Sequence, residues 1–236
     1  MTKTYQENCM LCGARLHYEE TPRVMRCALC GREAQTNAWC EAGHYICDAC
    51  HAQDASDVIE AFCLTKKTDD PAAMAREVMK HPKINMHGPE HHFLVAAVLL
   101  GASSAAGAEF DLKQALQTAR SRAKNVPGGM CGFCGTCGAA VGAGIYASVF
   151  LHATPLSEKT WSMSNLMTAA CLKTIGENGG PRCCKRDVFL ALRSAVDFAN
   201  EHFSLRMKNS DGRICTFYMR NQECKKRACP LYPLMD

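Results

Sequence analysis

The chain has 236 residues, of which 47% are hydrophobic and 21% charged, and its formal net charge is +4. This composition is that of an ordinary folded protein and excludes a disordered or fibrous chain. The charge excess is smaller than in most nucleic-acid-binding domains, so the charge does not support an RNA partner. The first residues contain no apolar signal segment, and no apolar run is as long as a membrane span. We therefore expect a cytoplasmic protein with no membrane partner.

Cysteine is the most unusual feature of the composition. The chain contains 17 cysteines, most of them in one group before residue 51 and another after residue 130. A reducing compartment disfavours a disulfide framework, and metal binding is then the common remaining reason for so many thiols. We therefore predict a metalloprotein. Cys63 stands alone and is expected to be a small buried hydrophobic residue.

The first cysteine group consists of closely spaced pairs of ligand-type residues. A Cys-x2-Cys turn places two thiolates at two corners of a tetrahedron, so two such pairs complete one zinc site. The spacing therefore predicts a module over residues 1–52 that binds two Zn²⁺ ions. Its ligand pairs are Cys9 and Cys12, Cys27 and Cys30, Cys40 and His44, and Cys47 and Cys50.

Two pairings of these ligands are open. In the interleaved pairing, the first and third pairs bind one ion and the second and fourth bind the other; in the sequential pairing, neighbouring pairs share an ion. The last four ligands span only 11 residues, from Cys40 to Cys50, which is short for closing around one ion. The sequence therefore favours the interleaved pairing. The string resembles the treble-clef and cross-brace zinc domains of the RING, PHD and FYVE-like group, in which zinc stabilises a piece with little core.

From residue 56 onward the sequence patterns are helical. Asp70 and Pro71 form a cap followed by proline at the first helical position, and residues 138–153 are rich in glycine and alanine, which permits close backbone packing. A short strand is expected near Ile214–Tyr218. The predicted fold is mainly α: a two-zinc N-terminal module followed by an all-α, cysteine-rich domain over residues 56–236. The predicted helices cover residues 56–66, 71–80, 91–106, 111–124, 138–153, 157–177 and 185–203.

The second cysteine group surrounds a glycine-rich segment with the spacing Cys131-x2-Cys134-x2-Cys137. Three thiolates spaced in this way wrap one face of an iron–sulfur cubane, and glycines let the backbone come close. Cys183 or Cys184 is the best candidate for a fourth ligand. Both segments stand at predicted helix starts, where free N–H groups and the helix dipole stabilise an anionic group. We therefore favour a [4Fe-4S] cluster; a third zinc site and buried free thiols are the alternatives.

A third group near the C-terminus has two interpretations. Cys215, Cys224 and Cys229 are candidate ligands of a further metal, together with Cys171 or with Cys183 or Cys184. Alternatively, Cys224 and Cys229 form a redox or sulfur-relay pair, because the neighbouring lysines and arginine would lower their pKa values.

Three consecutive residues at a predicted helix start, Glu90, His91 and His92, are candidate catalytic groups. Carboxylate and imidazole groups in this position could transfer protons near the cluster. An ordinary polar helix start is the competing interpretation.

Residues 127–200 weakly resemble the cysteine-bearing segments of iron–sulfur serine dehydratases and cysteine desulfidases. The similarity is carried by Gly129-x-Cys131, the Gly/Ala-rich helix, and the run Cys184-Lys-Arg-Asp187. Those enzymes use an open cluster iron as a Lewis acid, so the resemblance implies a small-molecule or sulfur-bearing substrate.

The whole chain resembles an uncharacterised, cysteine-rich family of bacterial and archaeal proteins, known as a domain of unknown function. The stretches that carry this resemblance are 43–51, 86–92 and 180–187. Members of that family can be fused to methyltransferase-type domains, which implies a partner enzyme.

Two functional hypotheses follow. The first is an iron–sulfur enzyme with lyase-type or sulfur-transfer chemistry at an open cluster iron. The alternative is a non-catalytic, zinc-binding adaptor that docks a partner enzyme or an RNA.

Overall fold

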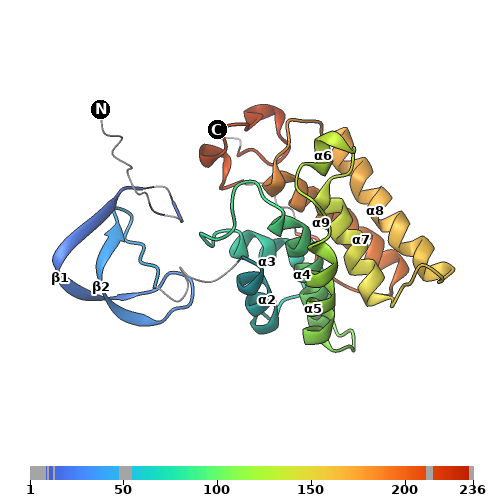
Figure 1. Cartoon of the computed structure of the whole chain (residues 1–236), viewed down its shortest axis with the longest axis horizontal. Helices are drawn as coiled ribbons and strands as arrows, with labels where there is room; N and C mark the ends of the chain where they lie inside the picture. Colours follow the sequence, from blue (N-terminus) through green and yellow to red (C-terminus); the bar gives the residue numbers. More distant parts are fainter. Residues whose placement is uncertain (1–8, 10, 13, 48–54, 211–214, 234–236) are drawn as a thin grey trace. The chain divides into compact units, whose positions relative to one another are not determined.

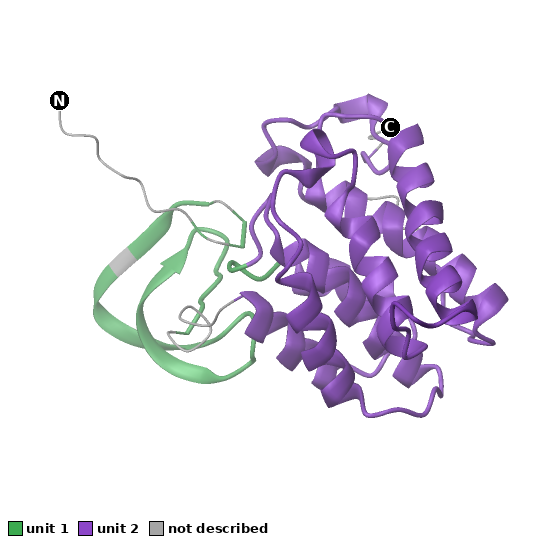
Figure 2. Ribbon diagram, turned by 45° about the vertical axis from the view of Figure 1, so that its right-hand side comes forward, with its two compact units in different colours: residues 1–54, 80–83 green, residues 55–79, 84–236 purple. Residues whose placement is uncertain are grey.

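The computed structural model describes residues 9, 11–12, 14–47, 55–210 and 215–233 (Figure 1). The chain divides into two compact units, residues 1–54 with 80–83 and residues 55–79 with 84–236 (Figure 2). The predicted class, a mainly helical protein with a small N-terminal cysteine module, is confirmed. None of the described helices is long and apolar enough to cross a membrane.

The first unit is built on an antiparallel hairpin of β1 (Leu16–Arg26) and β2 (Glu33–Cys40), which the sequence analysis did not predict. Arg26 pairs with Glu33 at the closed end, so the turn between the strands contains Cys27 and Cys30. Leu16 pairs with Cys40 at the open end. The hairpin therefore separates two groups of cysteines along its length.

The hydrophobic core of this unit is very small. Its buried members are Trp39, Tyr45 and two cysteines, Cys27 and Cys47. The guanidinium of Arg23 stacks on Trp39, 3.2 Å from the ring centroid. A unit with so little apolar burial needs another source of stability, which metal ligation supplies in many small domains.

The second unit is a bundle of helices around one apolar helix, α4. Every residue from His91 to Ser103 of α4 is buried. Helix α4 packs against α2, α3, α5, α7 and α9 (Figure 1). The helices are α2 (Ala55–Thr65), α3 (Pro71–Val78), α4 (Glu90–Ala105), α5 (Leu112–Ala123), α6 (Met130–Phe133), α7 (Gly138–Phe150), α8 (Lys159–Glu177) and α9 (Cys184–His202).

Local signals fix several helix starts as predicted. Asp70 accepts a hydrogen bond from the Ala73 N–H at 2.9 Å, and Pro71 follows as the first helical residue of α3. Asp111 caps α5 in the same way, through the Gln114 N–H. Cys63, the isolated cysteine, is fully buried in the core, as expected.

Glycine in α7 lets this helix approach α4 closely. A Cβ at Gly142 would overlap the backbone carbonyl oxygen of His92, which cannot rotate away. We therefore expect Gly142→Ala to lower the free energy of unfolding by about 2 kcal/mol in urea titrations. Gly176 in α8 is a matched control, because a Cβ there meets nothing within 4 Å. Gly176→Ala should be neutral or stabilising by up to about 1 kcal/mol, and equal stability of the two variants would contradict the packing argument.

The C-terminal segment after α9 is irregular. It contains two short 3-10 helices, η1 (Tyr218–Arg220) and η2 (Lys226–Ala228). The strand expected near Ile214–Tyr218 is wrong for the described residues 215–218, since Tyr218 already begins η1. The Cys215 N–H instead donates a single backbone hydrogen bond to the Leu231 carbonyl, at 2.7 Å.

Candidate metal centres

The open end of the hairpin brings together Cys9, Cys12, Cys40 and His44. One ligand atom from each lies within 4.8 Å of all the others. The Sγ atoms of Cys12 and Cys40 are 3.7 Å apart, and His44 Nδ1 is 3.5 Å from Cys40 Sγ and 3.9 Å from Cys9 Sγ.

These distances fit a single tetrahedral zinc ion. Zn–S bonds of about 2.3 Å and Zn–N bonds of about 2.0 Å require S–S edges of about 3.8 Å and N–S edges of about 3.5 Å. The donor set, three thiols and one imidazole, is also typical of structural zinc. The four side chains could therefore hold one metal ion of the zinc type.

The closed end of the hairpin brings together Cys27, Cys30 and Cys47, again with all sulfur atoms within 4.8 Å. The Sγ atoms of Cys30 and Cys47 are 3.8 Å apart. The fourth expected ligand, Cys50, lies outside the described residues. The first group joins the first and third pairs, and the second group joins the second pair to Cys47 of the fourth, which agrees with the interleaved arrangement that the sequence favours.

Backbone N–H groups favour the thiolate form of Cys27. Burial acts to raise the pKa of its thiol, but N–H groups of Cys30, Cys47 and Leu29 donate to the sulfur and together lower the pKa to about 6. A thiolate is the form that binds metal. The turn thus favours the ligand form of Cys27 near neutral pH.

In the second unit, three cysteines line a cavity of about 160 Å³: Cys131, Cys137 and Cys184. Cys131 belongs to α6, Cys137 is the N-cap of α7, and Cys184 is the first residue of α9. His91 and His92, from the first turn of α4, line the same cavity. The cavity therefore combines three thiols and two imidazoles. Four of these groups lie at the starts of the long helices α4, α7 and α9, and the fifth lies in the short helix α6.

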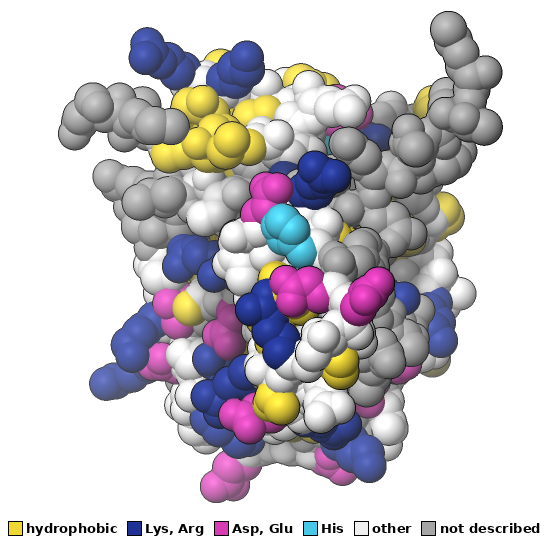
Figure 3. All heavy atoms as spheres, turned by 90° about the vertical axis from the view of Figure 1, so that its left-hand side faces the viewer, with side chains coloured by type: hydrophobic (Ala, Val, Ile, Leu, Met, Phe, Trp, Pro, Cys, Tyr) yellow, Lys and Arg dark blue, Asp and Glu magenta, His cyan; other side chains and the backbone are white. Residues whose placement is uncertain are grey.

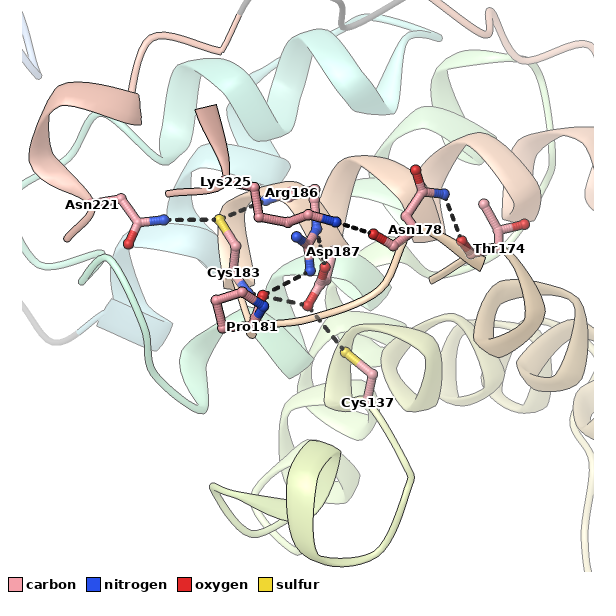
Figure 4. A network of polar contacts seen from close by, with 9 residues as sticks. All are labelled: Cys137, Thr174, Asn178, Pro181, Cys183, Arg186, Asp187, Asn221 and Lys225. Atoms are coloured by element: carbon pink, nitrogen blue, oxygen red, sulfur yellow. Dashed lines mark hydrogen bonds and ion pairs between the residues drawn. The ribbon is translucent and has the colours of Figure 1, made fainter. Parts of the chain in front are cut away.

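One residue predicted for this cluster, Cys134, and one of the two alternatives for its fourth ligand, Cys183, are placed elsewhere. Cys134 is exposed and does not line the cavity. Cys183 lines a different cavity, together with Cys215, Cys224 and Cys229. Figure 4 shows Cys183 next to Asn221, while Asp187 contacts Cys137. Adjacent cysteines at the start of α9 thus belong to two different sites.

The two histidines at the cavity are held as neutral bases. His91 Nδ1 donates to the Gly88 carbonyl at 3.0 Å, and His92 Nδ1 donates to the Val126 carbonyl at 3.1 Å. In each ring Nε2 then keeps its lone pair. His91 Nε2 is buried and has no hydrogen-bond partner among the described residues. Burial lowers the pKa of both histidines, that of His91 well below its ordinary value.

The third catalytic candidate, Glu90, lies beside the first histidine: its Oε1 is 3.6 Å from His91 Nδ1. Its Oε1 accepts a hydrogen bond from the Asn85 N–H at 2.9 Å, and it does not line the cavity with the two histidines. Its geometry is that of a residue that fixes the loop before α4.

The neutrality of His91 predicts a pH dependence of stability. Below its ordinary pKa of 6.5 the unfolded chain binds a proton that the folded chain excludes, so the free energy of unfolding falls as the pH drops. The slope reaches about 1.4 kcal/mol per pH unit for one group. Urea unfolding at pH 6.5 and 5.5 should therefore show a smaller loss in His91→Gln than in the natural chain. His44 is present in both proteins, so loss of zinc affects both; equal losses would contradict the prediction.

Charged side chains are buried next to the cysteines of α9. Lys185 and Arg186 are both buried, and burial lowers the pKa of Lys185 to about 7. The buried Asp187 pairs with Arg186 at 2.9 Å and also lines the cavity. Lys185 does not share this ion pair, because its Nζ donates to the Ile84 carbonyl at 3.3 Å. The sequence analysis did not assign Asp187 to the site, although it follows the cysteine pair directly.

Cys171, an alternative ligand for the C-terminal group, lines neither of these two cavities. It is buried in α8, and its Sγ donates to the Ala191 carbonyl at 3.4 Å. Its surroundings are those of a core cysteine.

The fold and these sites define a cysteine-rich, mainly helical protein with cysteine–histidine groups that can hold metal ions. Residues 59–232 match the model of a family described as "Family of unknown function (DUF5714)", and the chain belongs to that family. No curated protein and no solved structure matches the chain. The similarity to iron–sulfur dehydratases and desulfidases therefore rests on the residues quoted above alone.

Proposed function

We propose that this protein is an iron–sulfur enzyme whose cluster is held by Cys131, Cys137 and Cys184. The observation that carries the proposal is the cavity on which these three thiols converge. A cavity needs a volume of about 10–15 Å³ to hold one water molecule. This cavity, of about 160 Å³, therefore accommodates a group much larger than a water molecule or a single ion. Thiolates around a cubane each bind a different iron and are more widely spaced than around one ion.

Three protein thiolates leave one iron of a cubane without a protein ligand. When bound, such a cluster supplies a Lewis acid for lyase-type chemistry or a position for a sulfur atom. The substrate class is then a small molecule or a sulfur compound that fits the rest of the cavity. His92 and His91, each with a free Nε2 lone pair, are the groups of this chain that would accept its proton. The reduced thiols that the site needs suit a cytoplasmic location.

The test is metal analysis of the full chain purified without oxygen. We expect iron and acid-labile sulfide together with zinc, and a brown protein whose visible absorption is lost in air. A colourless protein that contains only zinc would overturn the proposal.

A zinc-binding adaptor is the second candidate, and the closely spaced ligand groups at the two ends of the hairpin favour it for the first unit. Such a unit would dock a partner enzyme. An RNA partner has less support, because basic and acidic side chains are interspersed on the face in Figure 3, with no basic stripe among its described residues. The adaptor predicts that deleting residues 1–54 abolishes association with a partner but leaves the iron content of the chain unchanged.

A further inference from the structure

We propose that Cys183, Cys215, Cys224 and Cys229 form a separate site for a single thiophilic ion, namely zinc. The four cysteines line one cavity with a volume of about 20 Å³. This space accommodates about one water-sized sphere, so it suits one ion and excludes a cluster. Four thiolates in a tetrahedral arrangement favour zinc over harder cations. This site is independent of the proposed cluster.

Nitrogen donors point at the sulfur atoms of this site. Cys183 Sγ accepts from the Asn221 side-chain amide at 3.4 Å and from the Arg186 N–H at 3.5 Å. The Phe217 N–H donates to Cys215 and the Lys226 N–H donates to Cys224, each at 3.4 Å. N–H groups that donate to sulfur ligands are a common feature of the surroundings of zinc sites.

The orientation of the Asn221 amide follows from its other contacts. Its Oδ1 is 3.2 Å from His87 Nε2 and accepts from the Glu223 N–H at 3.1 Å, so its amide nitrogen must face Cys183. Glu223 also pairs with His87 at 2.6 Å. These contacts hold the C-terminal segment against the loop before α4 and the start of α9.

In this structure the four sulfur atoms are not all within 4.8 Å of one another, as the ligands of one ion would be. Cys183 is fixed at the N-cap of α9, whereas Cys215, Cys224 and Cys229 lie on irregular chain beside η1 and η2. Zinc would draw these three towards Cys183.

Adjacent cysteines provide the test. In the full chain purified without oxygen, Cys183→Ser should lose one zinc ion per chain and keep its iron, whereas Cys184→Ser should lose iron and keep its zinc. Cys134→Ser, at an exposed position, is the control that should lose neither. If Cys183→Ser loses iron, or loses no zinc, the proposal is overturned.

A rescue separates ligation from folding. Histidine can replace cysteine as a zinc ligand, so Cys229→His should retain the zinc that Cys229→Ser loses. Loss in both variants would mean that Cys229 supports the fold without binding the ion. A natural chain that contains zinc only in the first unit would also overturn the site, whatever its iron content.

Discussion

Replacing Cys184 with serine is expected to remove the iron, the sulfide and the visible absorption of the protein completely. A serine oxygen is a poor ligand for this soft site, and two remaining thiolates would not retain a cubane. Cys131→Ser and Cys137→Ser should have the same effect, because all three thiols line one cavity. Iron analysis and the visible spectrum of each variant, purified without oxygen, measure the loss.

The matched control for these variants is Cys134→Ser. Cys134 belongs to the same Cys-x2-Cys-x2-Cys segment but is exposed and lies outside the cavity. It should keep its iron and its colour. Loss of the cluster from Cys134→Ser would mean that four cysteines bind the cluster, and the open iron on which the lyase-type or sulfur-transfer chemistry depends would be excluded.

The ligand groups of the first unit could be predicted from the sequence because the geometry of each pair is local. A Cys-x2-Cys turn fixes its two thiols by itself, and the short span from Cys40 to Cys50 argues against closing one site within it. The hairpin that separates the two groups was missed. Residues 33–40 alternate weakly in burial, but Trp39 is the only large apolar side chain among them. Their strand structure depends on pairing with β1 and not on a strong pattern of their own.

The sequence predicted that only one of Cys183 and Cys184 joins the cluster, but which of the two could not be predicted, because it depends on the backbone at one residue. Cys183 is extended, with φ −147° and ψ 100°, and the helix begins at the next residue. The two side chains therefore diverge into different cavities. The tautomer of His92 could not be predicted either, because the carbonyl that accepts from its Nδ1 belongs to Val126, 34 residues away. Spacing along the chain identified the right residue types, and tertiary contacts decided which of them share a site.

Removing zinc from the first unit is expected to unfold it while the helical unit stays folded. Metal binding contributes about 10–16 kcal/mol to the folding of small zinc domains, and the core of this unit is too small to replace that energy. Trp39, which is only 7% exposed, reports on the unit through its fluorescence. The other tryptophan, Trp161, is half exposed. Trp161→Phe should therefore leave Trp39 as the sole source of tryptophan fluorescence without lowering the stability of the second unit.

In Trp161→Phe, a chelator should shift the emission of Trp39 to longer wavelength as the ring enters water, and added zinc should restore it. Cys40→Ser in the same background should give the shifted emission without chelator, because Cys40 is a buried member of the first ligand group. Far-ultraviolet circular dichroism should change little in either case, since the helices belong to the second unit. An unshifted Trp39 emission after measured loss of zinc would show that the hairpin folds without metal, and zinc would then have to act in something other than the stability of this unit.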